Sequence, residues 1–200
     1  MKLANFTVEQ LKALPLRGIV AFAARCARRV EDLAQLPEGH PQRKNRREAI
    51  EAALRMADSF AKGTGAPLDE SVVTAIDANR DAGGDLTCTT AASAVAQAAH
   101  AAAAAWRVET GVAEDSREPG RHTTEARRGP GDLTHNTADL AAMNAYTAAA
   151  EGFISVGYRN EDFVDASLKD YHTLVRLQLG RYPELGNPVD PSPGGPLGPL

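Results

Sequence analysis

Apolar residues recur along the first third of the chain at the spacing of α-helices. From Leu16 to Leu33 they follow one another in steps of three and four residues, which places them on one face of a helix. The run Thr7-Val8-Glu9-Gln10 has the form of a capping box, and Pro15 is favourable at the first position of a helix. We therefore expect helices over about 8–14, 15–36 and 41–62.

The rest of the chain continues this helical pattern. Asp69 can cap a fourth helix that the pair Gly83-Gly84 would stop, and Thr89 or Thr90 can cap a fifth. No alternation of apolar and polar residues is sustained over the length of a strand. The sequence therefore predicts an all-α fold, a single bundle of six or seven helices. The later helices are expected over about 70–82, 91–108, 134–159 and 161–179.

Residues 91–110 are unusual because eleven of the twenty are alanine. The polar positions Ser93, Gln97, His100 and Arg107 are spaced so that they fall on one stripe of a helix. A flexible spacer would not be so regular, and a membrane segment would be rich in leucine. We predict a central helix whose small side chains allow its neighbours to approach closely.

The helix expected over 134–159 is a suitable neighbour, because it also contains runs of alanine. Its larger apolar side chains are expected to face the interior of the bundle. These are Leu140, Met143, Tyr146, Phe153 and Ile154, and Ala150 is expected to face inward with them.

Two stretches do not fit helices. Residues 112–136 form a polar stretch that is longer than the usual connection in a compact domain. Residues 180–200 contain six prolines and five glycines, which exclude a regular helix or a central strand. We divide the chain into a helical bundle domain, 1–180, and a Pro/Gly-rich C-terminal tail, 181–200. The tail is either a strap over the bundle, a peptide that a partner binds, or a disordered end.

Charge is distributed unevenly, although the net charge is only −4. Residues 1–62 hold twelve Lys and Arg against seven Asp and Glu, whereas residues 63–200 hold ten against nineteen. Either the two halves pack together and neutralise each other, or the basic half binds a protein partner, for which an acidic surface is one candidate. The absence of aromatic residues interleaved with the basic run argues against nucleic acid as the partner. The candidate basic face comprises Arg25, Arg28, Arg43, Lys44, Arg46 and Arg47.

Recognised catalytic motifs are absent from the sequence: it has no HExxH, CxxC, GxSxG or phosphate-binding loop. We therefore expect no metal and no cofactor. A polar residue on the alanine-rich helix could still line a ligand pocket if its stripe faced a cleft. The candidate ligand-binding residues are His100, Gln97, Tyr146 and Tyr171.

The cellular location is predicted from the cysteines and from the apolar segments. Cys26 and Cys88 are too few for a disulfide framework and are expected to be reduced thiols. The first residues, MKLANFTVEQ, contain no apolar core of a secretion signal. The apolar stretch 16–29 is too short and too basic to cross a bilayer. These features predict a cytoplasmic protein without a membrane segment.

Two stretches resemble known sequences. "LPLRGIVAFAARCARRV" (14–30) and "LGRYPELGNPVDPSPGGPLGPL" (179–200) resemble the start and end of a family of uncharacterised bacterial alanine-rich helical proteins. The resemblance implies that the tail belongs to the protein, and it implies no activity.

These observations favour a non-enzymatic, cytoplasmic protein–protein interaction module that uses either the basic face or the tail. An enzyme that binds a small molecule or a metal in a pocket around His100 is the first alternative. A nucleic-acid-associated protein is the second. The sequence alone leaves the oligomeric state open.

Overall fold

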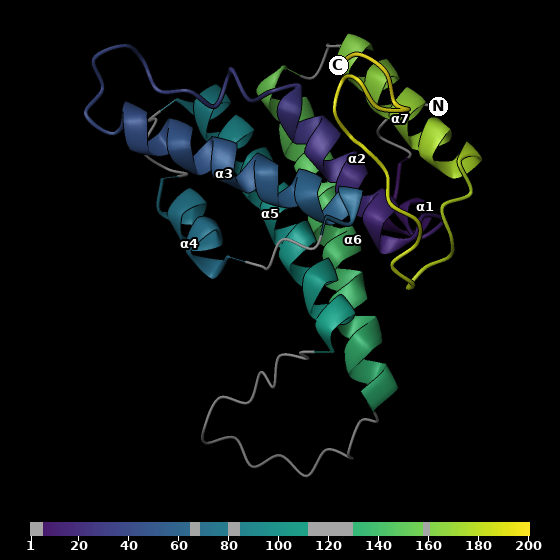
Figure 1. Cartoon of the computed structure of the whole chain (residues 1–200). Helices are drawn as coiled ribbons and strands as arrows, with labels where there is room; N and C mark the ends of the chain where they lie inside the picture. The colour runs from purple at the N-terminus through teal and green to yellow at the C-terminus, as the bar shows by residue number, and fades with distance from the viewer. Residues whose placement is uncertain (1–5, 65–68, 80–84, 112–129, 158–160) are drawn as a thin grey trace.

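The computed structural model describes residues 6–64, 69–79, 85–111, 130–157 and 161–200, and these residues form a bundle of helices (Figure 1). They contain seven helices and no strand, which confirms the predicted all-α bundle. The helices are α1 (Val8–Leu11), α2 (Leu16–Arg28), α3 (Arg43–Lys62), α4 (Glu70–Asn79), α5 (Leu86–Thr110), α6 (Pro130–Ser155) and α7 (Glu161–Arg176).

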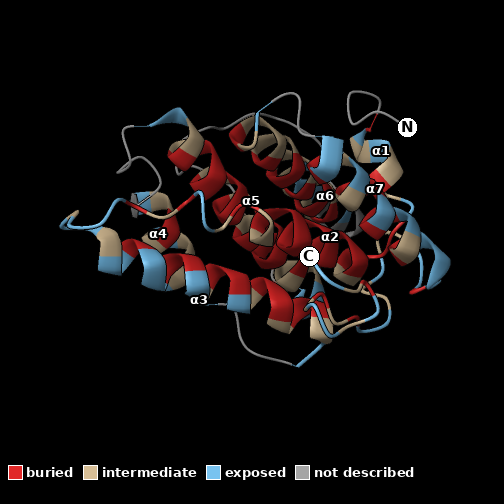
Figure 2. Ribbon diagram, turned by 90° about the horizontal axis from the view of Figure 1, so that it is seen from above, coloured by how far each residue is buried: buried red, intermediate tan, exposed pale blue. Residues whose placement is uncertain are grey.

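Helix α5 is the centre of the bundle. It contacts α2, α3, α4 and α6, and every alanine between Ala91 and Ala105 is buried. Helix α6 runs antiparallel to α5 along its whole length, with α3 and α4 on one side of this pair and α1 and α7 on the other (Figures 1 and 2). Small side chains on α5 are what allow four neighbours to pack around a single helix.

Helix α6 faces the core with its alanines, which corrects the expected orientation of Leu140 and Met143. These two side chains are half exposed, whereas Tyr146 and Phe153 are partly buried and pack against the core, and Ile154 is partly buried. The inward positions are small because α5 and α7 approach closely. At Gly152, for example, an added Cβ would lie 2.7 Å from the Phe163 ring of α7. The buried alanines are Ala138, Ala141, Ala142, Ala145, Ala148 and Ala149.

The largest departures from the expected helix boundaries are at the end of α2 and at the start of α5. Helix α2 ends at Arg28, not near residue 36, and turns follow it. In these turns the Ala34 carbonyl accepts a hydrogen bond from Arg46 Nε at 2.6 Å instead of a bond within a helix. Helix α5 begins earlier than expected because Asp85 caps it: the Asp85 carboxylate accepts a hydrogen bond from the Thr87 amide.

The polar stretch expected over 112–136 is helical in its last part. Helix α6 begins at Pro130, so that residues 130–136 belong to this helix. Residues 112–129 lie outside the described residues.

The C-terminal tail lies along the bundle as a strap. The Glu184 and Leu185 carbonyls accept hydrogen bonds, both of 2.9 Å, from the first two amides of α2. These amides have no partner within a helix, and the preceding Pro15 provides no side-chain cap. Further along the tail, the Val189 amide donates to the carbonyl of Ala61 in α3. The tail therefore joins the start of α2 to the end of α3.

The alanines of α5 can be tested by enlarging one of them. Ala99→Leu would add three carbon atoms at a fully buried position, and we expect it to lower the free energy of unfolding by about 1–3 kcal/mol, because neighbouring helices must move apart. Ala78→Leu, at an exposed position on α4, is the matched control and should change stability little. Urea denaturation followed by circular dichroism measures both. Equal stability of the two variants would contradict the close packing of α5.

Candidate functional site

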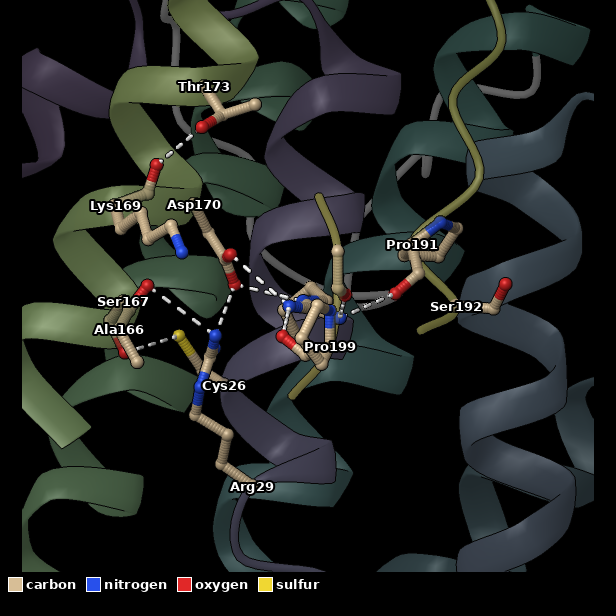
Figure 3. Close-up of polar contacts among 12 residues, drawn as sticks. Cys26, Arg29, Ala166, Ser167, Lys169, Asp170, Thr173, Pro191, Ser192 and Pro199 are labelled. Carbon is tan, nitrogen blue, oxygen red and sulfur yellow. Dashed lines mark hydrogen bonds and ion pairs between the residues drawn. The ribbon is translucent and has the colours of Figure 1, made fainter. Parts of the chain in front are cut away.

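A buried ion-pair cluster joins α2 to α7 (Figure 3). The Arg25 guanidinium donates from Nε and Nη2 to the two carboxylate oxygens of Asp170, at 2.9 and 3.3 Å. Arg29, one turn further along α2, donates from Nη2 to Asp170 Oδ2 at 2.6 Å. Arg25 is 0% exposed and Asp170 2% exposed. Two buried guanidinium groups thus share one carboxylate.

The tail supplies the remaining partners of Arg25. The Gly198 carbonyl accepts from Arg25 Nη1 at 2.9 Å, and the Pro199 carbonyl accepts from Nη2 at 2.8 Å. The Pro191 carbonyl is a longer acceptor, 3.4 Å from Nη1. These contacts satisfy the donors of a charged group that would otherwise be buried without partners. The tail residues thus complete the interior of the protein.

Cys26 lies beside this cluster, and its thiol donates to the Ser167 hydroxyl at 3.7 Å. Burial raises the pKa of Cys26 to about 11, although the nearby Arg29 charge opposes this shift. The thiol therefore stays protonated near neutral pH and is a poor nucleophile. Cys26 and Cys88 are both buried free cysteines.

The second buried arginine, Arg46 on α3, also acts inside the protein. It is 0% exposed. Its Nε donates to the Ala34 carbonyl, and its Nη2 donates to the Cys88 carbonyl at 2.9 Å and lies 3.3 Å from the Cys88 sulfur. Arg46 therefore holds the turns after α2 against the first turn of α5.

The expected basic face is wrong for Arg25 and Arg46, since both guanidinium groups are buried. Their charges are compensated by Asp170 or by backbone carbonyls far away in the sequence, which helical periodicity cannot reveal. Arg28 is also mostly covered, and it pairs with Asp58 and, at 3.6 Å, with Glu31.

The exposed basic residues of α3 alternate with acidic ones. Lys44 lies 3.8 Å from Glu48, and Arg47 lies 3.9 Å from Glu51, each pair one turn apart. Arg43 is 3.7 Å from Glu38. This surface is therefore mixed in charge, and a selective attraction for an acidic partner has little support in it.

The polar stripe of α5 faces α4. His100 Nε2 lies 3.1 Å from an Asp77 carboxylate oxygen, and Arg107 donates to Glu70 at 3.4 Å. Gln97, which precedes His100 by three residues on the same stripe, is partly buried. The stripe thus faces neither open water nor a cleft lined by the other candidate residues, because α4 packs on it.

The two candidate tyrosines do not join His100 in one site. Tyr171, on α7, is 8% exposed, donates from its hydroxyl to the Gln10 carbonyl at 3.0 Å and packs against Phe6. Helix α7 lies across the bundle from α4, which carries the partner of His100 (Figures 1 and 2). Tyr146 is partly buried against the core from α6.

An uncharged stripe on the outward side of α6 is the surface feature that sequence reasoning missed. Leu140 and Met143 are 51% and 52% exposed, one turn apart, and the helical spacing places four more residues on the same side. The six residues of the stripe are not ionisable, but Asp139 and Glu151 lie beside it. Asp139 is paired with Lys12 and Tyr182, and Glu151 is partly buried. We name this stripe the outer α6 face: Asn136, Leu140, Met143, Thr147, Ala150 and Ile154.

A signal for this face was present in the sequence. Residues 138–150 have alanine or a larger apolar residue on every side of the helix, and a helix of this kind is normally covered all round. The expectation that large residues point inward concealed the signal, because it assigned them to the core.

Two features of the described residues bear on other classes of function. In the described part of the chain, His, Cys, Asp and Glu side chains do not gather in any group of three that could hold a metal ion. No helix in that part has both the length and the apolar character to cross a membrane.

Comparison with known proteins gives no relative. No protein-family model matches the chain, and neither a curated protein nor a solved structure matches it. The resemblance of 14–30 and 179–200 to bacterial alanine-rich helical proteins therefore stays a prediction.

The buried cluster can be tested by removing its carboxylate charge. Asp170→Asn leaves Arg25 and Arg29 buried without a counter-charge, so we expect the free energy of unfolding to fall by about 3–5 kcal/mol. Glu51→Gln removes a carboxylate that pairs with exposed Arg47 and Arg55, and it should cost less than about 1 kcal/mol. Urea denaturation compares the two. Similar losses of unfolding free energy in the two variants would show that the Asp170 cluster contributes no more to stability than a surface ion pair.

The docking of α4 on the polar stripe makes a separate prediction. His100→Ala removes the contact to Asp77 and should lower global stability by less than about 1 kcal/mol, because both side chains are partly exposed. Amide hydrogen exchange in α4 should nevertheless become faster. Gln97→Ala is the control on the same stripe and should leave α4 unchanged. Unchanged exchange in α4 of the His100→Ala variant would contradict this role.

Proposed function

We propose that this protein is a non-enzymatic helical module that binds another protein through the outer α6 face. The observation that carries the proposal is the pair Leu140 and Met143, each half exposed and one turn apart on an uncharged stripe. Covering a side chain of this size from half exposure contributes about 2 kcal/mol, at about 25 cal/mol per Å². Two such side chains on one face would therefore stabilise a complex through apolar burial, without any contribution from charged groups.

The arrangement of these side chains distinguishes them from other exposed apolar residues. Single exposed leucines or valines are common and require no explanation. Leu33 follows α2, Leu86 starts α5, Val175 and Leu177 lie at the end of α7, and Leu200 is the last residue of the tail. Leu140 and Met143 instead lie in the interior of a 26-residue helix, on a stripe that continues to Ile154.

The sites first expected to bind a partner have less support than the outer α6 face. Arg25 and Arg46 are buried, the exposed basic residues of α3 have acidic neighbours, and the tail is engaged by the bundle. An uncharged stripe favours an apolar helical surface as its partner over an acidic one. The pocket enzyme also has less support, because α7, which carries Tyr171, lies across the bundle from α4, which His100 contacts through Asp77.

Site-specific crosslinking in the cells that make the protein tests this proposal. With p-benzoylphenylalanine in place of Met143, we expect a covalent adduct with the bound protein. The same residue in place of Lys44, which is exposed on the charged side of α3, is the control and should give no adduct. Leu140→Glu in the Met143-labelled chain should abolish the adduct, since it places a charge on the stripe. Adduct yields at 143 no higher than at 44 would overturn the proposal.

A further inference from the structure

We propose that Arg25 and Arg29 form a binding site for a small oxyanion of the phosphate type, and that residues 192–199, which we name the distal tail, cover this site. Such a site is separate from the outer α6 face, since it lies between α2 and α7. The charge of the buried cluster, the tail oxygens on Arg25 and the attachment of the tail each support it.

The buried cluster has an excess of one positive charge. Arg25 and Arg29 each carry a positive charge, and among the described residues Asp170 is the carboxylate with which both pair. Arg29 also lacks partners: its side chain is 8% exposed, and its Nε and Nη1 atoms are buried without a hydrogen-bond partner. A buried charge without a counter-charge is costly, so an anion that joined the cluster would stabilise it.

The tail oxygens on Arg25 show where this anion would bind. The Nε and Nη2 side of the guanidinium group binds Asp170. The other side, formed by Nη1 and Nη2, is capped by two neutral oxygens, the carbonyls of the consecutive residues Gly198 and Pro199, at 2.9 and 2.8 Å. Two oxygens of one phosphate-type anion fit the same planar fork. Unlike the carbonyls, the anion would also supply the missing negative charge.

Arg29 favours a phosphate-type anion over a carboxylate. Arg25 Nε and Arg29 Nη2 both donate to Asp170 Oδ2, so the two guanidinium groups lie side by side (Figure 3). A carboxylate has two oxygens, and the fork of Arg25 alone would occupy both. A phosphate-type anion has further oxygens that a donor of Arg29 can bind.

The tail is attached to the bundle in two parts, which allows the distal tail to lift by itself. Backbone hydrogen bonds to α2 and α3 hold residues 184–189. The distal tail has no ionisable side chain, and it is held by two carbonyls on Arg25 and by the buried side chain of Leu197. Its release therefore leaves no charge of the tail without a partner, and the main cost is the exposure of Leu197.

Titration of the full chain with inorganic phosphate, followed by the amide resonances in NMR spectra, tests this site against sodium chloride of equal ionic strength. We expect half-saturation on the order of 1 mM, because the small fraction of chains with a lifted distal tail reduces the affinity. Arg29→Gln removes the excess charge and the unpartnered donors, so it should weaken phosphate binding by about tenfold or more. Arg55→Gln, at an exposed position on α3, is the charge-matched control and should bind phosphate like the wild type.

A second variant tests the distal tail while both arginines stay in place. Leu197→Ala weakens the closed position of the distal tail, so we expect phosphate to bind about fivefold more tightly than to the wild type. Leu86→Ala, at a position that is 71% exposed at the start of α5, is the matched control and should leave the affinity unchanged. Circular dichroism verifies that the variants keep their helices. The Leu197→Ala comparison stands even where Arg29→Gln unfolds the bundle.

Three results would overturn the site. Phosphate affinity that a folded Arg29→Gln variant retains would place the anion elsewhere. Phosphate affinity that Leu197→Ala leaves unchanged would show that the anion does not bind under the distal tail. The absence of phosphate binding up to about 50 mM, in both the wild type and Leu197→Ala, would show that the excess charge attracts no oxyanion.

Discussion

The close packing of helices around α5 is the constraint on which the rest of the structure depends. Helix α5 contacts four other helices, and its alanines from Ala91 to Ala105 are all buried. Interiors are packed as densely as organic crystals, so each neighbour must approach α5 with small side chains of its own. Helix α6 meets this requirement by turning its alanines inward. Its leucine and methionine side chains consequently lie outside, where they form the face to which we assign binding.

A core of alanines buries little apolar surface per residue, since the free energy gained on burial scales with area. The fold adds buried polar contacts that join segments far apart in the sequence. Arg25 joins α2 to α7 and to the tail, and Arg46 joins α3 to the first turn of α5 and to the turns after α2. Arginine is suited to this role because its five donors can bind a carboxylate and several carbonyls at once. The chain thus uses two of its basic residues to fix the non-helical segments.

These interior roles change the interpretation of the surface. Two of the basic residues in the first 62 positions, Arg25 and Arg46, are buried inside the protein. The exposed cations on α3 pair with nearby carboxylates. The tail in turn is bound by α2 and α3 and serves the interior. What remains as a distinctive surface is the uncharged outer α6 face. An interaction there depends on shape and apolar area, and therefore changes little with salt concentration.

The sequence by itself determined the helical elements, the all-α class and the central place of residues 91–105, because periodicity and alanine content act locally. It also determined that the tail could not be helical, since its prolines lack amide donors. Only the tertiary structure decided which side of α6 is inside: both alanine and leucine are apolar, and the space left by α5 selects the smaller. Likewise, periodicity could not foresee that Arg25 is buried, because its partners are 145 to 174 residues away. The local pattern of residues indicates only that α6 is apolar on all sides. The packing around α5 decides which of these sides stays exposed as the outer α6 face.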